Sequence, residues 1–378
     1  MRLNVVLGWV ALLMAAPTAA QVTTPAPPTI PATSYVLMDH QTGDILASRE
    51  PDLRLPPASI TKVMTLYIAF DEITKGHTSL DDEVLISEKA WRAQGSRSFI
   101  EVGNRVRLED LLHGIIVQSG NDASIAVAEH IAGDESVFAQ LMNKHAARIG
   151  MVNTHFTNSS GLPDDAMLTS VRDIALMSQA LIRDFPDFYA WFKEREFVFN
   201  DIRQPNRNRL LFEDASVDGI KTGHTEAAGY CLAASAIRDG RRLISVVMGT
   251  NSTNARTQAS RALLEYGFRF FDTAQLLGPA KPVTQARVYG GAADEVSAGT
   301  LEPLAITLGR DGAERVETTF TLKSPLKAPL SVGQEIGEVT VSLDGEVLRT
   351  TSLVALVDVE RGSLWKRFID WIRLLIAG

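Results

Sequence analysis

Three short segments of the chain carry side chains that could together perform nucleophilic catalysis. They read Ser59-Ile60-Thr61-Lys62, Ser119-Gly120-Asn121 and Lys221-Thr222-Gly223. A serine hydroxyl is a poor nucleophile until a base removes its proton, and Lys62 follows Ser59 by about one helical turn. A lysine amine can be that base only if it is neutral near pH 7, which burial and a neighbouring cation such as Lys221 favour. These residue types predict a serine that is acylated by a substrate carbonyl.

The second segment suits proton transfer and amide binding. Ser119 can pass a proton toward a leaving amine, and Asn121 can hold a substrate amide with both its donor and its acceptor. Each segment alone also has a structural interpretation, in which Ser59 and Asn121 cap helices, Ser119 lies in a turn and residues 221–223 form a surface turn. The Ser-x-x-Lys pattern occurs three times in the chain. Only the pattern at Ser59 lies at a predicted helix start in the same domain as the other two segments, which favours catalysis.

The third segment suits recognition of a peptide end. Lys221 and Thr222 are suited to a negatively charged carboxylate, and Gly223 would let a strand approach the substrate backbone closely. An oxyanion that forms at the attacked carbonyl needs hydrogen-bond donors. The backbone N–H groups of Ser59 and His224 are the most natural pair.

The longer stretches around these residues resemble the low-molecular-mass penicillin-binding proteins that act as D-alanyl-D-alanine carboxypeptidases. The stretches are 57–65, 118–123 and 219–225, which read PASITKVMT, QSGNDA and GIKTGHT. The resemblance covers nearly the whole chain after its first twenty residues. It implies that peptidoglycan stem peptides ending in D-Ala-D-Ala acylate the serine and release D-alanine before hydrolysis. It also implies that β-lactams trap the acyl-enzyme, and it implies no metal or cofactor.

The resemblance assigns roles to individual residues. Catalytic roles go to Ser59, Lys62, Ser119, Asn121 and Lys221, while Thr222, Gly223 and His224 line the substrate strand. Arg256 and Arg207 also look like family positions, and either could face the terminal carboxylate or simply pair with surface acids. The loop Gly161–Met167 departs from the family pattern, which leaves the hydrolysis rate and the substrate preference open.

Other activities could use the same three segments. A serine β-lactamase needs a base for the deacylating water, which in class A enzymes is a glutamate before the third segment. No glutamate occurs between Glu135 and Glu194, so slow release of penicillin is the simpler expectation, although Asp164 could stand in. DD-endopeptidase or transpeptidase activity at the same site also remains open. A non-catalytic wall-binding protein is disfavoured because the serine and both lysines are intact.

An α+β fold must position these segments. Strands are predicted at 35–38 and 45–47, and a helix that starts near Ser59 follows them. Helical spacing of apolar residues recurs at 108–117, 123–131, 137–149 and 171–182, and strands at 229–237 and 243–249 are followed by a helix at 255–271. This order predicts an antiparallel sheet flanked by helices. Beyond Gly278-Pro279 short β-rich runs predict a smaller all-β domain.

The expected organisation has five parts. Residues 1–20 form a signal peptide, 21–33 an extended lead-in, 34–275 the catalytic domain, 276–360 the β-rich domain and 361–378 an amphipathic helix. The leader has one positive charge and an apolar run that Pro17 ends before it could span a bilayer. In the tail, Trp365 and five aliphatic or aromatic residues after it recur at helical spacing, which suits the membrane surface. Packing of this helix on the β-rich domain is the alternative.

Composition limits the partners and the compartment. The net charge of −8 and the isoelectric point near 5.5 offer no basic surface for nucleic acid. The single cysteine, Cys231, excludes an intramolecular disulfide and is expected in the core. The leader and the tail together predict an exported enzyme that is peripheral to the periplasmic face of a bacterial inner membrane.

Overall fold

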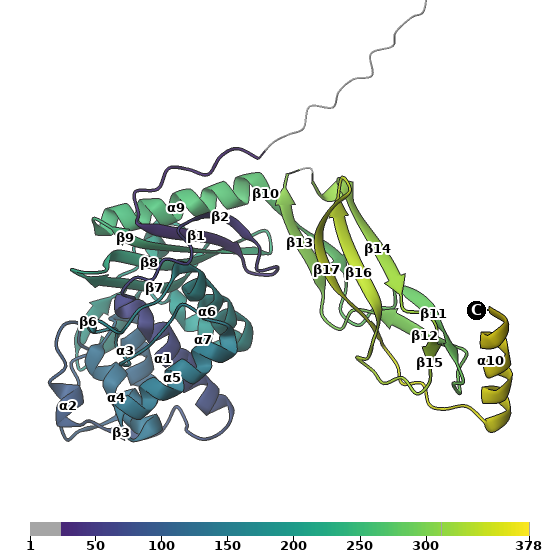
Figure 1. The fold of residues 1–378 in the computed structure, drawn as a ribbon. Coiled ribbons are helices and arrows are strands. Elements are labelled where there is room, and N and C mark those ends of the chain that lie inside the picture. The colour runs from purple at the N-terminus through teal and green to yellow at the C-terminus, as the bar shows by residue number, and fades with distance from the viewer. Residues whose placement is uncertain (1–23, 311, 378) are drawn as a thin grey trace, which may run out of the picture.

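A computed structural model describes residues 24–310 and 312–377 (Figure 1). The predicted signal peptide lies outside the described residues. Residues 24–33 contain neither helix nor strand and lead into the first strand. The molecule then has two domains and a C-terminal helix, so the predicted fold class is confirmed.

The first domain is built on a five-stranded antiparallel sheet in the order β2-β1-β9-β8-β7. The strands are β1 (Ser34–Asp39), β2 (Ile45–Arg49), β7 (Val217–Thr225), β8 (Gly229–Arg238) and β9 (Arg241–Thr250). Alternate residues point to opposite faces of a strand, so Tyr35 and Leu37 pack with helix α9 (Thr253–Phe270) while Val36 and Met38 pack with the other helices. Figure 1 shows α9 on one face of the sheet and the helical lobe on the other.

The helical lobe holds the first two of the three segments that the sequence predicts to be catalytic. Its helices are α1 (Lys62–Thr74), α2 (Glu88–Trp91), α3 (Leu108–Val117), α4 (Asn121–Ala132), α5 (Glu135–Ile149), α6 (Val171–Asp184) and α7 (Pro186–Tyr189). Helix α8 (Leu210–Glu213) instead joins the core on the α9 face of the sheet through Leu210 and Leu211. The lobe also contains two short 3₁₀ turns, η1 (Ala58–Thr61) and η2 (Ala190–Lys193). It is completed by two short strand pairs, β3 (Glu83–Leu85) with β4 (Arg105–Arg107) and β5 (Glu196–Phe199) with β6 (Ile202–Pro205). Helix α1 is buried on every side from Lys62 to Phe70. This stretch is therefore central in the domain, and its polar side chains Lys62 and Thr65 are satisfied by hydrogen bonds.

The second domain is all-β. A six-stranded sheet has the order β14-β16-β17-β12-β11-β15, and β10 pairs with β13 in a separate sheet. The strands are β10 (Phe271–Leu277), β11 (Thr284–Tyr289), β12 (Glu295–Gly299), β13 (Leu304–Gly309), β14 (Val316–Leu322), β15 (Leu326–Lys327), β16 (Glu335–Leu343) and β17 (Glu346–Ala355), with a 3₁₀ turn η3 (Ala313–Arg315). Asp44 ties the domains together, because its carboxylate binds Arg349 at 2.5 Å and the backbone N–H of Thr307 at 3.0 Å.

A final helix, α10 (Leu364–Ala377), packs beside β11 at the far end of the second domain (Figure 1). Within residues 24–310 and 312–377, no helix is long and apolar enough to cross a bilayer.

Candidate active site

The turn η1 places Ser59 at the mouth of a cavity and Lys62 directly beneath it. Ser59 is partly exposed, whereas Lys62 is completely buried at the start of α1. The Lys62 Nζ lies 3.1 Å from the Ser59 Oγ. It also donates to the Asn121 Oδ1 at 2.7 Å and to the Ser160 carbonyl at 2.5 Å. The amine is therefore held on three sides, one of which is Ser59, the predicted nucleophile.

The pKa of Lys62 is lowered from 10.5 to about 7, first by burial and next by the positive charge of Arg207. Asp122 and Glu135 oppose this shift. A neutral amine has two N–H groups and one lone pair. Because Asn121 Oδ1 and the Ser160 carbonyl can only accept, they take the two N–H groups and leave the lone pair for the Ser59 hydroxyl.

Burial also lowers the pKa of Lys221 well below its usual value, and Lys62, Arg207 and Arg256 add to the shift. The sequence suggested Lys221 as a cation that depresses the pKa of Lys62. The two amines repel each other when both are charged, and this repulsion contributes to the lowered pKa of Lys221, while Arg207 acts on both lysines.

Ser119 lies between α3 and α4 in the left-handed region, with φ of +67°. Its side chain is 2% exposed, and its Oγ has no hydrogen-bond partner among the described residues. A buried hydroxyl without a partner costs free energy unless a ligand or water meets it. Asn121 opens α4, and its Nδ2 donates to the Gln94 carbonyl at 2.5 Å. Asn121 therefore has one amide N–H left for a substrate.

The third segment lies on β7, which is an edge strand of the sheet. The strand passes close to the nucleophile turn, because a Cβ on Gly223 would lie 3.2 Å from the Ala58 Cβ and 3.2 Å from the Pro57 carbonyl oxygen. A side chain at Gly223 would thus press on η1, a packing reason for the glycine that the sequence did not indicate. The outer edge of β7 is free of a neighbouring strand in the described part, so an extended peptide can pair with it.

A cavity of about 620 Å³, which we call the catalytic pocket, joins these elements. Its lining consists of Ser59, Gly95, Ser96, Ser119, Arg207, Thr222, Gly223, His224, Tyr230, Thr253 and Arg256. Seven of the ten predicted site residues are in this lining, and the other three, Lys62, Asn121 and Lys221, are buried. The lining contains two arginines and no carboxylate, which suits an anionic ligand.

Sequence comparison identifies the family. The family model for D-alanyl-D-alanine carboxypeptidase, peptidase S11, matches residues 21–252. This chain belongs to that family. The C-terminal domain of penicillin-binding protein 5 matches residues 271–361.

Individual relatives align with this chain over almost its whole length. D-alanyl-D-alanine carboxypeptidases DacA and DacC of Escherichia coli K12 are each 40% identical to it, and their alignments cover 93% and 96% of this chain and 89% and 93% of the relatives. The crystal structure of penicillin-binding protein 5 from Haemophilus influenzae is 41% identical, with a TM-score of 0.86, and the match covers 89% of this chain and all of that one. The predicted enzyme class, a serine-type D-Ala-D-Ala carboxypeptidase, is confirmed.

The two arginines of this carboxypeptidase have different settings. Arg256 is 6% exposed, and its guanidinium donates to the Gly223 carbonyl at 3.1 Å and lies over the Tyr230 ring. Burial lowers its pKa to about 10. Arg207 is exposed and donates to the Ser96 Oγ at 2.7 Å. Within the described part of the chain neither arginine forms a salt bridge, so the alternative of pairing with surface acids finds no support there.

Four pocket residues escaped the sequence analysis: Gly95, Ser96, Tyr230 and Thr253. Tyr230 pairs with His224 across β7 and β8, and the two rings lie against each other at a tilt of 34°, with centroids 4.0 Å apart. Had residues 217–225 also been predicted as a strand, their hairpin register with the predicted strand at 229–237 could have indicated Tyr230. The loop that carries Gly95 and Ser96 has no periodic pattern that points to the pocket.

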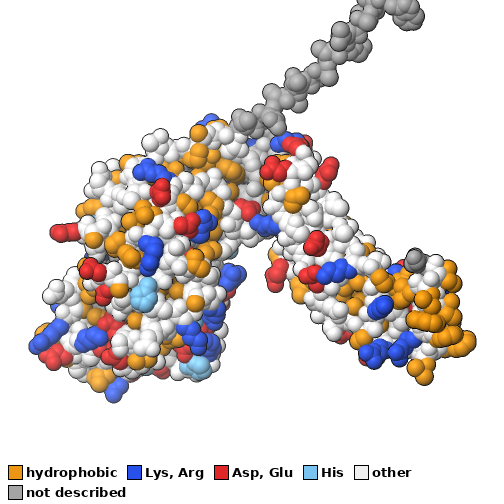
Figure 2. All heavy atoms as spheres, in the orientation of Figure 1, with side chains coloured by type: hydrophobic (Ala, Val, Ile, Leu, Met, Phe, Trp, Pro, Cys, Tyr) orange, Lys and Arg blue, Asp and Glu red, His pale blue; other side chains and the backbone are white. Residues whose placement is uncertain are grey.

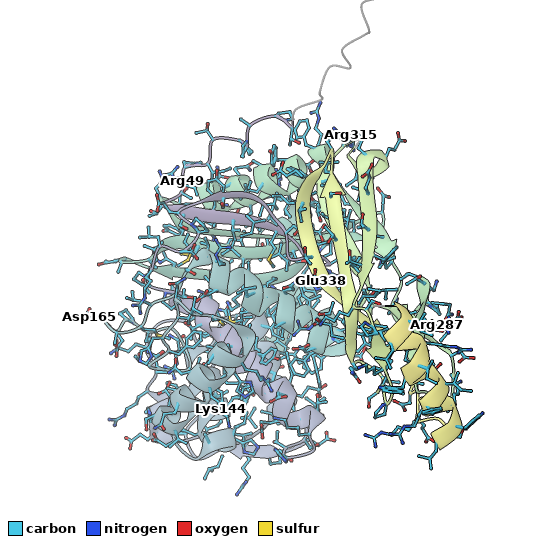
Figure 3. All side chains as sticks on the ribbon, turned by 45° about the vertical axis from the view of Figure 1, so that its right-hand side comes forward. Arg49, Lys144, Asp165, Arg287, Arg315 and Glu338 are labelled. Carbon is cyan, nitrogen blue, oxygen red and sulfur yellow. The ribbon has the colours of Figure 1, made fainter. Side chains whose placement is uncertain are left out.

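The loop 161–167, which departs from the family pattern, lies against the other side of η1, the turn that carries Ser59. Gly161 has φ of +82°, and a Cβ there would lie 1.9 Å from the Ala58 carbonyl oxygen. A second cavity of about 240 Å³ lies between this loop, Ala58 and Thr225, with Asp164 and Asp165 in its lining. Figure 3 labels Asp165 at the outer edge of the catalytic domain.

Proposed function

We propose that this carboxypeptidase removes the terminal D-alanine of peptidoglycan stem peptides through an acyl-enzyme on Ser59. The observation that carries the assignment is the Lys62 amine, which is buried, lies 3.1 Å from the Ser59 Oγ and has a pKa of about 7. Neutral Lys62 takes the Ser59 proton as the Oγ attacks the carbonyl of the penultimate residue. The backbone N–H groups of Ser59 and His224, two residues that line the same pocket, stabilise the oxyanion.

Collapse of the tetrahedral intermediate breaks the peptide bond and releases D-alanine, whose amine receives the proton through Ser119. The unpartnered Ser119 hydroxyl supports this relay. Asn121 fixes the Lys62 amine and offers its remaining N–H to the substrate amide. Water then attacks the acyl carbonyl, the bond to the Ser59 Oγ breaks, and the free enzyme and the shortened peptide result.

The free carboxylate of the substrate is the group that selects carboxypeptidase action. Thr222 and Arg256 line the pocket beside Gly223, and Lys221 lies buried next to them. An arriving carboxylate favours the charged form of Lys221, whose pKa is otherwise depressed. Arg207 adds a second guanidinium to the same pocket.

Penicillin labelling tests the nucleophile. Intact-protein mass spectrometry after penicillin exposure should show one covalent adduct, and peptide mapping should place it on Ser59. The adduct should persist long enough to isolate, because the stretch between residues 135 and 194 lacks a glutamate base. A label on another serine would overturn the assignment, and a label shed within milliseconds would favour a β-lactamase.

We further infer that α10 holds the enzyme on an anionic membrane surface. The helix packs with a polar side toward the second domain, where Asp370 is 2% exposed and accepts from the Gly290 N–H at 2.8 Å, and Lys366 binds Asp294 at 2.9 Å. Its apolar side chains face outward, among them Leu364 at 81% exposure and Ile376 at 81%. Figure 2 shows them as a continuous hydrophobic surface at the end of the second domain. The observed packing supports the surface role over the alternative in which the apolar face packs on the β-rich domain.

Cations border this apolar surface. A cavity of about 250 Å³ between α10 and the second domain has Lys327, Arg361 and Arg367 in its lining. Each cation near an anionic surface adds about 1 kcal/mol of attraction. Truncation after Gly362 should release active enzyme from anionic vesicles with little change in melting temperature. A truncated protein that stays on the vesicles, or that loses several degrees of stability, would refute the membrane role.

The predicted signal peptide and the periplasmic location also remain proposals. A leader with one positive charge, an apolar run and the small residues Ala19 and Ala20 supports cleavage before Gln21. N-terminal sequencing of the mature protein should begin at Gln21. Recovery of Met1 on a membrane-bound protein would indicate an uncleaved anchor instead.

A further inference from the structure

Glu135 is a buried carboxylate that none of the steps above uses. It is the first residue of α5 and is 8% exposed. One of its oxygens, Oε1, accepts from the Ser159 N–H at 3.1 Å and from the Ser159 hydroxyl at 2.6 Å. The other oxygen pairs with the Lys89 ammonium at 3.0 Å. Glu135 therefore holds Ser159, which is itself fully buried.

The segment Asn158–Gly161, which we call the 158–161 turn, contacts the catalytic helix through its carbonyl groups. The Ser159 carbonyl accepts from the Thr65 hydroxyl at 2.6 Å, and the Ser160 carbonyl accepts from the Lys62 amine at 2.5 Å. Lys62 and Thr65 are one helical turn apart, so they present both donors on the same face of α1. The Asn158 side chain closes the turn by accepting from the Gly161 N–H at 2.8 Å.

We propose that Glu135 is a positioning residue for acylation, which holds the 158–161 turn so that the Ser160 carbonyl aims the Lys62 amine at Ser59. The inference rests on the proposed roles of Ser59 and Lys62. Loss of the Glu135 carboxylate would leave the N–H and hydroxyl of Ser159 buried without an acceptor, and the turn would have to move to satisfy them. The amine would then lose one of the two acceptors that orient its lone pair.

The charge of Glu135 acts on the same amine. Glu135 and Asp122 face Lys62 from α5 and α4 and raise its pKa, while Arg207 lowers it. Lys221 lies on the adjacent strand with a depressed pKa, and Lys89 is the direct partner of Glu135. Removal of the negative charge alone should therefore lower the pKa of Lys62 further and extend acylation to lower pH.

Two substitutions separate position from charge. Glu135→Gln keeps an oxygen that can accept from Ser159 but removes the charge, whereas Glu135→Ala removes both. Acylation by penicillin is measured as a single-turnover rate constant against pH, and melting temperature reports folding. We expect Glu135→Ala to lower the high-pH plateau by about 10-fold to 10²-fold, the range that a misplacement of roughly 1 Å produces. Glu135→Gln should keep the plateau. Its acid limb, the part of the profile in which the acylation rate falls as the pH is lowered, should move to lower pH.

Glu88→Gln is the matched control, because Glu88 is an exposed carboxylate next to Lys89 that pairs with Arg92. It should leave both the plateau and the acid limb unchanged. A folded Glu135→Ala enzyme with the wild-type plateau would overturn the proposal, and so would a Glu135→Gln plateau as low as that of alanine. An acid limb that stays in place in Glu135→Gln would overturn the electrostatic part. Failure of the wild type to label on Ser59 would instead overturn the proposed function.

Discussion

Replacement of Lys62 by methionine should separate catalysis from stability. Methionine keeps roughly the length and volume of the lysine stem but cannot accept a proton. Acylation should fall by about 10²-fold to 10⁴-fold, the usual contribution of a general base. In the wild type the acylation rate should rise with pH to a plateau above about 7, because Lys62 is protonated and inactive below that pKa.

The stability of the same variant follows from opposing terms. The pKa of Lys62 is about 7 in the fold against 10.5 for an exposed lysine, a difference that corresponds to about 5 kcal/mol of destabilisation as an upper bound. Methionine removes this cost but leaves Asn121 Oδ1 and the Ser160 carbonyl without their donor, at about 1–3 kcal/mol each. The terms nearly cancel, so the variant should melt within a few degrees of the wild type at pH 7.

The sign of the pH dependence is fixed by the direction of the shift. Below pH 7 Lys62 is charged in both states and the full cost is present, whereas above pH 10.5 it is neutral in both and the cost is gone. Wild-type stability from this group therefore rises between pH 7 and 10.5. The stability of the methionine variant relative to wild type should therefore fall between pH 7 and pH 10. Acylation at the wild-type rate, or a relative stability that grows with pH, would refute the assignment of Lys62 as a buried base.

Two further substitutions test neighbouring parts of the site. Arg256→Ala should reduce cleavage of substrates with a free C-terminal carboxylate but should not affect cleavage of their amides. Equal cleavage rates for acid and amide in the wild type would exclude carboxylate recognition as the basis of selectivity. Wild-type kinetics of the variant would mean that Arg256 is only a helix charge. Gly161→Ala should destabilise the domain by several kcal/mol and impair acylation, because the alanine Cβ would lie 1.9 Å from the Ala58 carbonyl oxygen and φ at this position is +82°. An unchanged melting temperature in circular dichroism would contradict this packing.

The sequence predicted the strands and helices that carry a strong apolar pattern. The predicted helices at 108–117 and 171–182 correspond to α3 and α6, and the central strands differ by only a few residues. Short elements such as α2 and the β5–β6 hairpin were missed, because four residues are too few for a period to show. Their conformation depends on tertiary contacts.

The proposed catalytic residues can be recognised in the sequence, whereas their supporting contacts cannot. Ser59, Lys62 and Lys221 stand in short patterns that the chemistry requires. Glu135 stands in an ordinary helix start, and its link to Lys62 passes through the 158–161 turn, which the sequence places far from both. Only the fold reveals such a contact, because no local pattern encodes which buried carboxylate meets which turn.

The distribution of charge around Ser59 connects recognition with catalysis. Arg207 and Arg256 line the pocket, and both lie close enough to Lys221 to lower its pKa. Binding of a substrate carboxylate would neutralise part of this positive field and so raise the pKa of both lysines. The carboxylates that support the protonated form of Lys62, Asp122 and Glu135, lie outside the pocket lining. In the free enzyme Lys62 is thus ready to accept a proton. The ammonium that forms during attack is stabilised by the carboxylates of Asp122 and Glu135, which the substrate does not contact.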